Sequence, residues 1–169
     1  ARGLVQLAAA NYERELGGLS PLLVPLNRLF LGNPGTGKTT VAALYGQILN
    51  ELGLLSKGDV VLATPSDLIG SALGQSEEKT NALLDKAAGC VLVIDEAYGL
   101  DPNGGGLSGI GGGGGGGGGG IAGGDPFKTA VIDTLVSRVQ GDAGADRCVL
   151  MLGYRKEMER FIRRGNPGL

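Results

Sequence analysis

One glycine-rich segment combines the residue types that bind phosphate. It reads Gly32-Asn33-Pro34-Gly35-Thr36-Gly37-Lys38-Thr39-Thr40, which matches the GxxxxGK[ST] pattern of a phosphate-binding loop. Glycines let the backbone curl until successive amides point at one anion. Lys38 supplies a positive charge for the outer phosphates, and the Thr39 hydroxyl can bind Mg²⁺. The whole segment is therefore predicted to bind the phosphates of a nucleotide.

The residues on either side of this loop support that interpretation. The apolar run Asn27–Leu31 precedes it and predicts a buried strand, whereas residues 41–49 carry apolar side chains at helical spacing. A strand, a loop and a helix in this order are the context that the motif requires. The first turn of the helix adds unpaired N–H groups that favour an anion. A glycine-rich turn that matches by accident is the alternative, and the flanking elements count against it.

A pair of acidic residues forms a second candidate for chemistry. Asp95 and Glu96 directly follow the unbroken apolar run Cys90–Ile94, which predicts a central parallel strand. Most acid pairs at such a place are only a solvated strand exit. A phosphate loop, however, needs a carboxylate partner for its Mg²⁺. Asp95 is therefore predicted to hold the ion, and Glu96 to polarise a water for attack on the γ-phosphate.

Strands alternate with helices along the rest of the chain. Helices are predicted at 2–16, from the loop to about Leu52, from Ser76 (with its hydroxyl at the cap) to Gly89, behind Asp125-Pro126, and at 155–164; further strands are predicted at 60–63 and 148–152. This alternation favours a three-layer α/β fold with a parallel sheet. Ligands of such sheets lie beyond the carboxyl ends of the strands, where the loop and the acid pair would meet.

Residues 102–124 form a glycine-rich segment with an unbroken glycine tract at 111–120. Such a segment cannot bury enough apolar surface to offset its chain entropy. It is predicted to be a disordered insertion at the surface of a single domain that spans residues 1–169.

Composition excludes several other classes of function. The formal charge of −2 gives no reason to expect nucleic acid or a membrane surface as a partner. The chain has neither a signal-peptide pattern nor a long apolar run, so a soluble cytoplasmic or nuclear protein is expected. Histidine is absent, which excludes its acid–base chemistry and its metal ligation. Cys90 and Cys148 begin predicted core strands and are expected to be buried and inert.

Three motifs together resemble the AAA+ ATPases, a family of three-layer P-loop NTPases. They are GNPGTGKTT at 32–40, VLVIDEAY at 91–98 and NPGL at 166–169. The nearest group is the one that holds red-type rubisco activase and stage V sporulation protein K, with its fungal multi-AAA branch. The resemblance implies that Lys38 contacts the β- and γ-phosphates of ATP or ADP. It also implies that Thr39 and Asp95 serve Mg²⁺, that Glu96 is the catalytic base, and that neighbouring subunits form a ring around a protein substrate.

The chain departs from the family pattern at two positions. Relatives carry an aromatic residue in a central-pore loop, whereas the loop at 70–74 has Ala72 in that place. Leu73 could offer an apolar surface there, or the loop could simply cap a helix. The polar sensor residue should fall near Gly153-Tyr154-Arg155, and no asparagine is present there. Both departures count against full remodelling activity.

Other family parts should lie outside the chain. The adenine-contacting segment is expected before Ala1, and the arginine supplied to the neighbouring subunit, together with the helical lid, after Leu169. The chain is therefore expected to be a core truncated at both ends and nearly inactive alone, because an arginine in trans contributes roughly 10³–10⁵-fold to turnover.

Two hypotheses follow. The first is an ATP-driven remodeller of protein partners, and the second is a regulatory or scaffold domain that binds ATP and hydrolyses it weakly or not at all. A small GTPase is disfavoured, because the DxxG match at 101–104 lies at the glycine-rich segment and the chain has no [NT]KxD motif.

Overall fold

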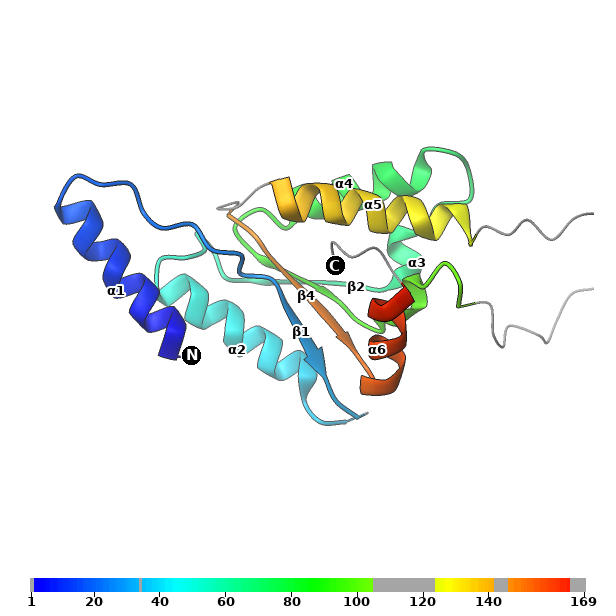
Figure 1. The fold of residues 1–169 in the computed structure, drawn as a ribbon, viewed down its shortest axis with the longest axis horizontal. Coiled ribbons are helices and arrows are strands. Elements are labelled where there is room, and N and C mark those ends of the chain that lie inside the picture. Colours follow the sequence, from blue (N-terminus) through cyan, green and yellow to red (C-terminus); the bar gives the residue numbers. More distant parts are fainter. Residues whose placement is uncertain (1, 34, 105–123, 142–145, 165–169) are drawn as a thin grey trace, which may run out of the picture.

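The computed structural model describes residues 2–33, 35–104, 124–141 and 146–164 (Figure 1). Its four strands form one sheet in the order β1-β4-β3-β2, and each neighbouring pair is parallel. The strands are β1 (Arg28–Leu31), β2 (Val60–Ala63), β3 (Val91–Ile94) and β4 (Cys148–Gly153). The helices are α1 (Arg2–Leu16), α2 (Lys38–Glu51), α3 (Pro65–Leu68), α4 (Gln75–Lys86), α5 (Pro126–Gly141), α6 (Arg155–Arg164) and the 3₁₀ helix η1 (Ala97–Leu100).

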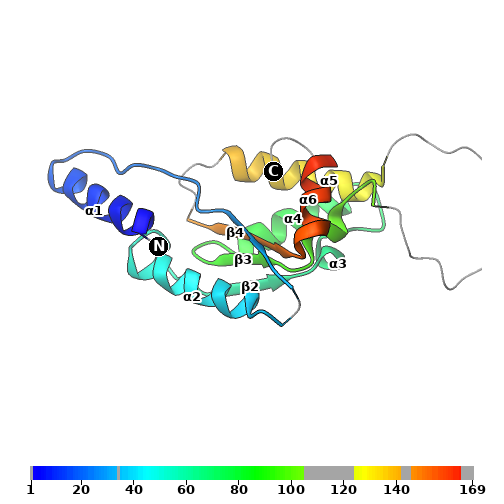
Figure 2. The ribbon, with the colours of Figure 1, turned by 60° about the horizontal axis from the view of Figure 1, so that its bottom comes forward.

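Helices cover both faces of this sheet, as predicted for a three-layer α/β fold. Figure 2 shows α2 on one side of the strands and α4, α5 and α6 on the other. Alternate residues of β3 point to opposite layers, because Val91 and Val93 join the cluster with Leu49 of α2, whereas Leu92 and Ile94 join the cluster with α4 and α5. The central strands are therefore buried on both faces. No helix in the described part of the chain is both long enough and apolar enough to cross a membrane.

The first strand is a correction to the sequence prediction. Residues 27–31 were expected to form a buried strand, yet β1 has only β4 as a neighbour among the described residues. Leu29 is 41% exposed. On the other edge, Leu62 of β2 is 60% exposed. Apolar composition predicts a strand correctly, but it does not distinguish the edge of a sheet from its centre.

The start of α4 also differs from the prediction. Ser76 was expected to cap this helix, but the cap is Gly74, whose φ of 80° lies in the left-handed region. Ser76 is buried inside the first turn, and its Oγ accepts the Gly70 N–H at 2.9 Å. By contrast, the predicted cap at Asp125 is confirmed, because its Oδ1 accepts the Phe127 N–H at 3.0 Å.

Two short helices were not predicted. In α3, Thr64 and Asp67 form a capping box, in which the Thr64 N–H donates to Asp67 Oδ2 at 2.7 Å. The helix η1 follows Glu96 directly. Both connect the carboxyl end of a strand to the next element, and η1 thereby shapes the edge of the sheet where the acid pair lies.

Several predicted features fall outside the described residues. They are Pro34 of the loop, residues 105–123 of the glycine-rich segment, and the NPGL motif at 166–169.

Candidate functional site

The strand order brings the two predicted motifs to one edge of the sheet. Strand β4 lies between β1 and β3, and the three strands run in the same direction. Their carboxyl ends therefore lead side by side into Gly32, Tyr154 and Asp95. A cavity of about 450 Å³ opens there. Its lining is Gly35, Thr36, Gly37, Lys38, Thr39, Thr40, Asp95, Glu96, Gly153 and Tyr154.

The backbone of the loop has the curl that a phosphate site needs. Gly35 and Gly37 have φ values of 72° and 77°, in the left-handed region where a β-carbon would be strained. Gly37 occupies the N-cap position of α2, and because it has no side chain, no side-chain hydrogen bond caps the first turn of the helix. A β-carbon on Gly32 would come within 2.8 Å of the Thr36 hydroxyl, which donates to the Asn33 carbonyl at 2.9 Å. The uncapped helix start is therefore available to an anion.

Lys38 is half buried beneath this loop. Its Nζ donates to the carbonyl oxygens of Gly32 at 3.1 Å and Asn33 at 3.0 Å. It also lies 5.3 Å from the centre of the Tyr154 ring. The ammonium is thus held at the loop by neutral groups, none of which cancels its charge.

The acid pair lines the same cavity as the loop. Asp95 Oδ1 accepts the N–H of Glu96 at 2.9 Å. Glu96 is exposed, and its φ of 51° makes it the one non-glycine residue with positive φ in the described parts of the chain. Such a conformation costs on the order of 1–3 kcal/mol and concentrates at functional sites. The chain therefore holds this carboxylate at the cavity against a local backbone preference.

Two tyrosines line up beside these charges. The rings of Tyr98 and Tyr154 stack with centroids 5.6 Å apart and an angle of 29° between their planes. Burial, followed by the charge of Glu96 and a hydrogen bond to Glu96, together raise the pKa of Tyr98 to about 12. Sequence reasoning placed a family sensor near Tyr154 but assigned neither ring a role. The position of Tyr154, directly after the strand between the two motifs, was the available signal.

The residues flagged as departures from the family pattern lie as follows. Arg155 is exposed and pairs with Glu159 at 3.8 Å, away from the lining of the cavity. Ala72 and Leu73 are exposed in the loop before α4, and Leu73 is 95% exposed. Gln75 anchors this loop, because its Oε1 accepts the Ser71 N–H at 2.7 Å. Leu73 is thus exposed in a loop that is held in place by Gln75.

The donor set of the cavity fits Mg²⁺ bound together with phosphates. The described residues contain no group of three or more His, Cys, Asp or Glu side chains that could hold a metal. Mg²⁺, however, commonly uses one or two protein oxygens and takes its remaining ligands from phosphates and water. Asp95 and the Thr39 hydroxyl, which line the same cavity, match that need.

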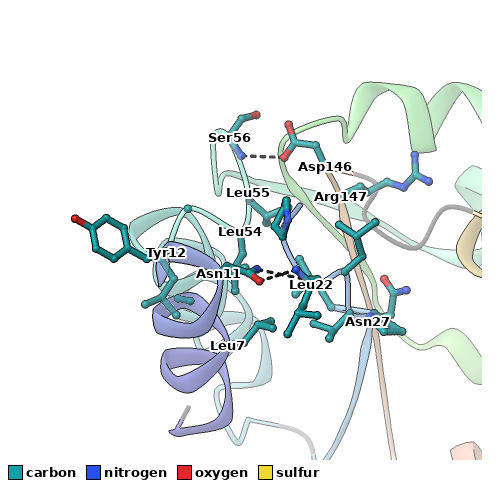
Figure 3. Close-up of a pocket in the computed structure, with 18 of the residues that line it drawn as sticks. Leu7, Asn11, Tyr12, Leu22, Asn27, Leu54, Leu55, Ser56, Asp146 and Arg147 are labelled. Carbon is teal, nitrogen blue, oxygen red and sulfur yellow. Dashed lines mark hydrogen bonds between the residues drawn. The ribbon is translucent and has the colours of Figure 1, made fainter. Parts of the chain in front are cut away.

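A larger cavity of about 910 Å³ lies at the opposite, amino end of the strands (Figure 3). It opens between α1, the connection to β1 and the turn after α2. Two of its polar side chains bond to backbone groups of the same lining: Asn11 makes two hydrogen bonds to the backbone of Leu22, and Asp146 accepts the Ser56 N–H at 2.9 Å. The smaller cavity is therefore the candidate site, because it brings Lys38, Asp95 and Glu96 together with the uncapped start of α2.

Comparison with known proteins identifies similar chains. The family model "ATPase family associated with various cellular activities (AAA)" matches residues 28–161. Stage V sporulation protein K of Bacillus subtilis is 37% identical over 94% of this chain and 43% of that protein. Protein CbxX (chromosomal) of Cupriavidus necator is 34% identical over 99% of this chain and 47% of that protein. The chain thus spans less than half the length of these relatives.

A solved structure shares the fold. The crystal structure of the FIGL-1 AAA domain in complex with ADP matches 96% of this chain and 48% of that chain, with a TM-score of 0.54 and 19% sequence identity.

Proposed function

This chain belongs to the AAA family of ATPases, as the resemblance in its sequence predicted, and we propose that its phosphate loop and acid pair bind and hydrolyse Mg-ATP. One observation carries the proposal. The loop with Lys38 and the carboxylates of Asp95 and Glu96 line the same cavity at the carboxyl edge of the sheet. Ligands of parallel α/β sheets bind at such an edge.

Each residue has a definite task in this proposal. The amides of the loop and of the first turn of α2 bind the phosphates, and Lys38 exchanges its carbonyl contacts for phosphate oxygens. Asp95 and Thr39 would hold Mg²⁺, which when bound neutralises charge on the phosphates. Glu96 orients the attacking water and accepts its proton. The reaction then depends mainly on positioning and charge, which these residues supply.

We further propose that hydrolysis serves the remodelling of protein partners in a ring of neighbouring subunits. The family match over residues 28–161 supports this, because the resemblance to AAA+ ATPases implies a ring of subunits that acts on a protein substrate. The exposed Leu73 offers an apolar contact in place of the missing aromatic residue. The competing proposal is a regulatory domain that binds ATP without appreciable hydrolysis.

ATP turnover by the natural full-length protein separates the two proposals. Glu96→Gln removes the proton acceptor with little change in shape, so turnover should fall about 10²–10⁴-fold while Mg-ATP still binds. Glu51→Gln is the matched control, because Glu51 is exposed at the far end of α2. Turnover that is negligible in the unsubstituted protein would favour the regulatory domain, and equal, appreciable turnover in both variants would contradict the role of Glu96.

A further inference from the structure

We propose that Tyr154 is a positioning residue that fixes Lys38 and, through the stacked ring of Tyr98, the segment that carries Glu96. This inference rests on the proposed function of the same cavity. It assigns the aromatic pair a role that neither the phosphate-loop motif nor the acid pair contains.

The topology places Tyr154 between the two groups. It follows β4, which separates β1 from β3, so the ring emerges between the loop after β1 and the acid pair after β3. No other strand end has this position, because β2 lies beyond β3 at the edge of the described sheet. A side chain at this place can contact both motifs at once.

The ring of Tyr154 faces Lys38. The ammonium has three N–H groups, and the carbonyl oxygens of Gly32 and Asn33 accept hydrogen bonds from it. The Tyr154 ring, 5.3 Å from Nζ, completes the surroundings with its electron-rich face. Such a contact orients the lysine without neutralising it, so the charge remains available to a phosphate.

The same ring also stacks on Tyr98. The two rings stack at 5.6 Å, and Tyr98 lies two residues after Glu96 at the start of η1. Gly153 makes room for this arrangement, because a β-carbon there would come within 3.1 Å of Tyr98 Cδ1 and 2.6 Å of Met158 Cγ. Tyr98 thus supports the strained backbone at Glu96, and Tyr154 in turn holds the Tyr98 ring in place.

The surroundings of Tyr154 argue against a role in the core. Neither of the two hydrophobic clusters formed by the described residues includes it, whereas Tyr98 packs at the margin of one. Its ring therefore contributes to the cavity more than to the stability of the fold. Removal of the ring should therefore change the positions of Lys38 and Tyr98 more than it changes the stability of the fold.

The test compares Tyr154→Leu with Tyr154→Phe, and Tyr12→Leu on exposed α1 serves as the matched control. Two quantities are measured in the unsubstituted protein and in each variant: the affinity for Mg-ADP and the single-turnover rate constant for Mg-ATP. Tyr154→Leu keeps an apolar side chain but loses the aromatic face, so the affinity should fall about threefold to tenfold and the rate constant should fall as well. Tyr154→Phe and Tyr12→Leu should resemble the unsubstituted protein in both quantities.

Tyr98→Leu separates positioning from general damage. It should lower the rate constant far more than the affinity, because Tyr98 forms a hydrogen bond to Glu96, whereas the ring that faces Lys38 is that of Tyr154. In the double variant with Tyr154→Leu, the loss of rate should be smaller than the product of the single losses.

Three results would overturn the inference. One is a Tyr154→Leu variant equal to the unsubstituted protein in affinity and rate, and another is a Tyr154→Phe variant as impaired as Tyr154→Leu. The third is independent, multiplicative losses in the double variant. If the unsubstituted protein binds no Mg-nucleotide, the proposed function fails, and this inference fails with it.

Discussion

The cavities at the two ends of the sheet differ in size and in what their polar groups do. At the amino end, the cavity of about 910 Å³ is lined mainly by apolar residues, and two of its polar side chains, Asn11 and Asp146, form hydrogen bonds to nearby backbone groups. At the carboxyl end, about 450 Å³ is lined by Lys38, Asp95 and Glu96, whose charges are not paired with one another by any ion pair in the described residues. The hydrogen bonds in the larger cavity hold its own lining together, whereas the charged side chains of the smaller cavity can bind a charged ligand.

The two ends of the sheet also differ in how much their residues contribute to the stability of the fold. The amino end is held by buried leucines such as Leu55 and Leu26, which are 2% and 7% exposed. The carboxyl end keeps Glu96 in a left-handed conformation and leaves the start of α2 uncapped. Substitutions at the amino end should therefore change stability and leave nucleotide binding intact, and substitutions at the carboxyl end should do the reverse.

The largest effect on stability is expected from Leu55→Ala. Leu55 is buried in the cluster with Leu49 and Val91, so truncation should lower the free energy of unfolding by about 2–4 kcal/mol. Urea denaturation measures this change. Leu62→Ala is the control, because Leu62 is 60% exposed and should lose less than about 0.5 kcal/mol. A Leu55→Ala protein that is folded but has weaker Mg-ADP affinity would break the distinction between the two ends.

A smaller change of opposite sign is expected from Glu96→Asn. Asparagine tolerates the left-handed region better than glutamate, so the free energy of unfolding should rise by about 1 kcal/mol. Turnover should be lost in the same variant, because the carboxylate is gone. Thermal and urea unfolding would show the gain. A clear loss of stability would mean that the carboxylate stabilises the fold more than its backbone strain costs.

The smallest effect concerns alkaline pH and the buried thiol of Cys148. Burial raises the pKa of this thiol from its ordinary value of 9.0 to about 12, partly offset by Arg28. The folded chain therefore keeps the proton that the unfolded chain releases, and stability should fall as the pH rises from about 9 toward 12. Between pH 8 and pH 9.5 this amounts to about 0.8 kcal/mol. Urea unfolding of Cys148→Ala should show a correspondingly weaker dependence on pH, and an identical dependence would contradict the assignment.

Local signals predicted most of the fold. The bounds of α1, β2 and α6 agree with the sequence prediction. The signals for these elements are local, because they consist of apolar spacing within each segment and of glycine or proline close to its ends. The start of α4 was wrong because Ser76 bonds to Gly70 in the preceding loop, a contact that a capping rule does not consider. The capping box Thr64–Asp67 was visible in the sequence and would have predicted α3.

The residues of the candidate site show the same difference between local signals and contacts that depend on the fold. The loop and the acid pair are contiguous motifs, so spacing alone indicated them and the cavity they share follows from the parallel sheet. The stack of Tyr154 on Tyr98 joins residues from two different strand ends. It depends on the order β1-β4-β3 and on the small size of Gly153, neither of which a linear pattern contains.

Calorimetric titration with Mg-ADP tests the central claim most directly. The chain with Lys38→Ala is compared with Lys57→Ala, which removes the same charge from an exposed position at the amino end of the sheet. We predict that Lys38→Ala weakens binding by about a hundredfold or more, because charge-assisted contacts to phosphate are lost, and that Lys57→Ala binds normally. Equal affinities in the two variants, or no binding by the folded unsubstituted chain, would contradict the assignment of the carboxyl edge as a nucleotide site.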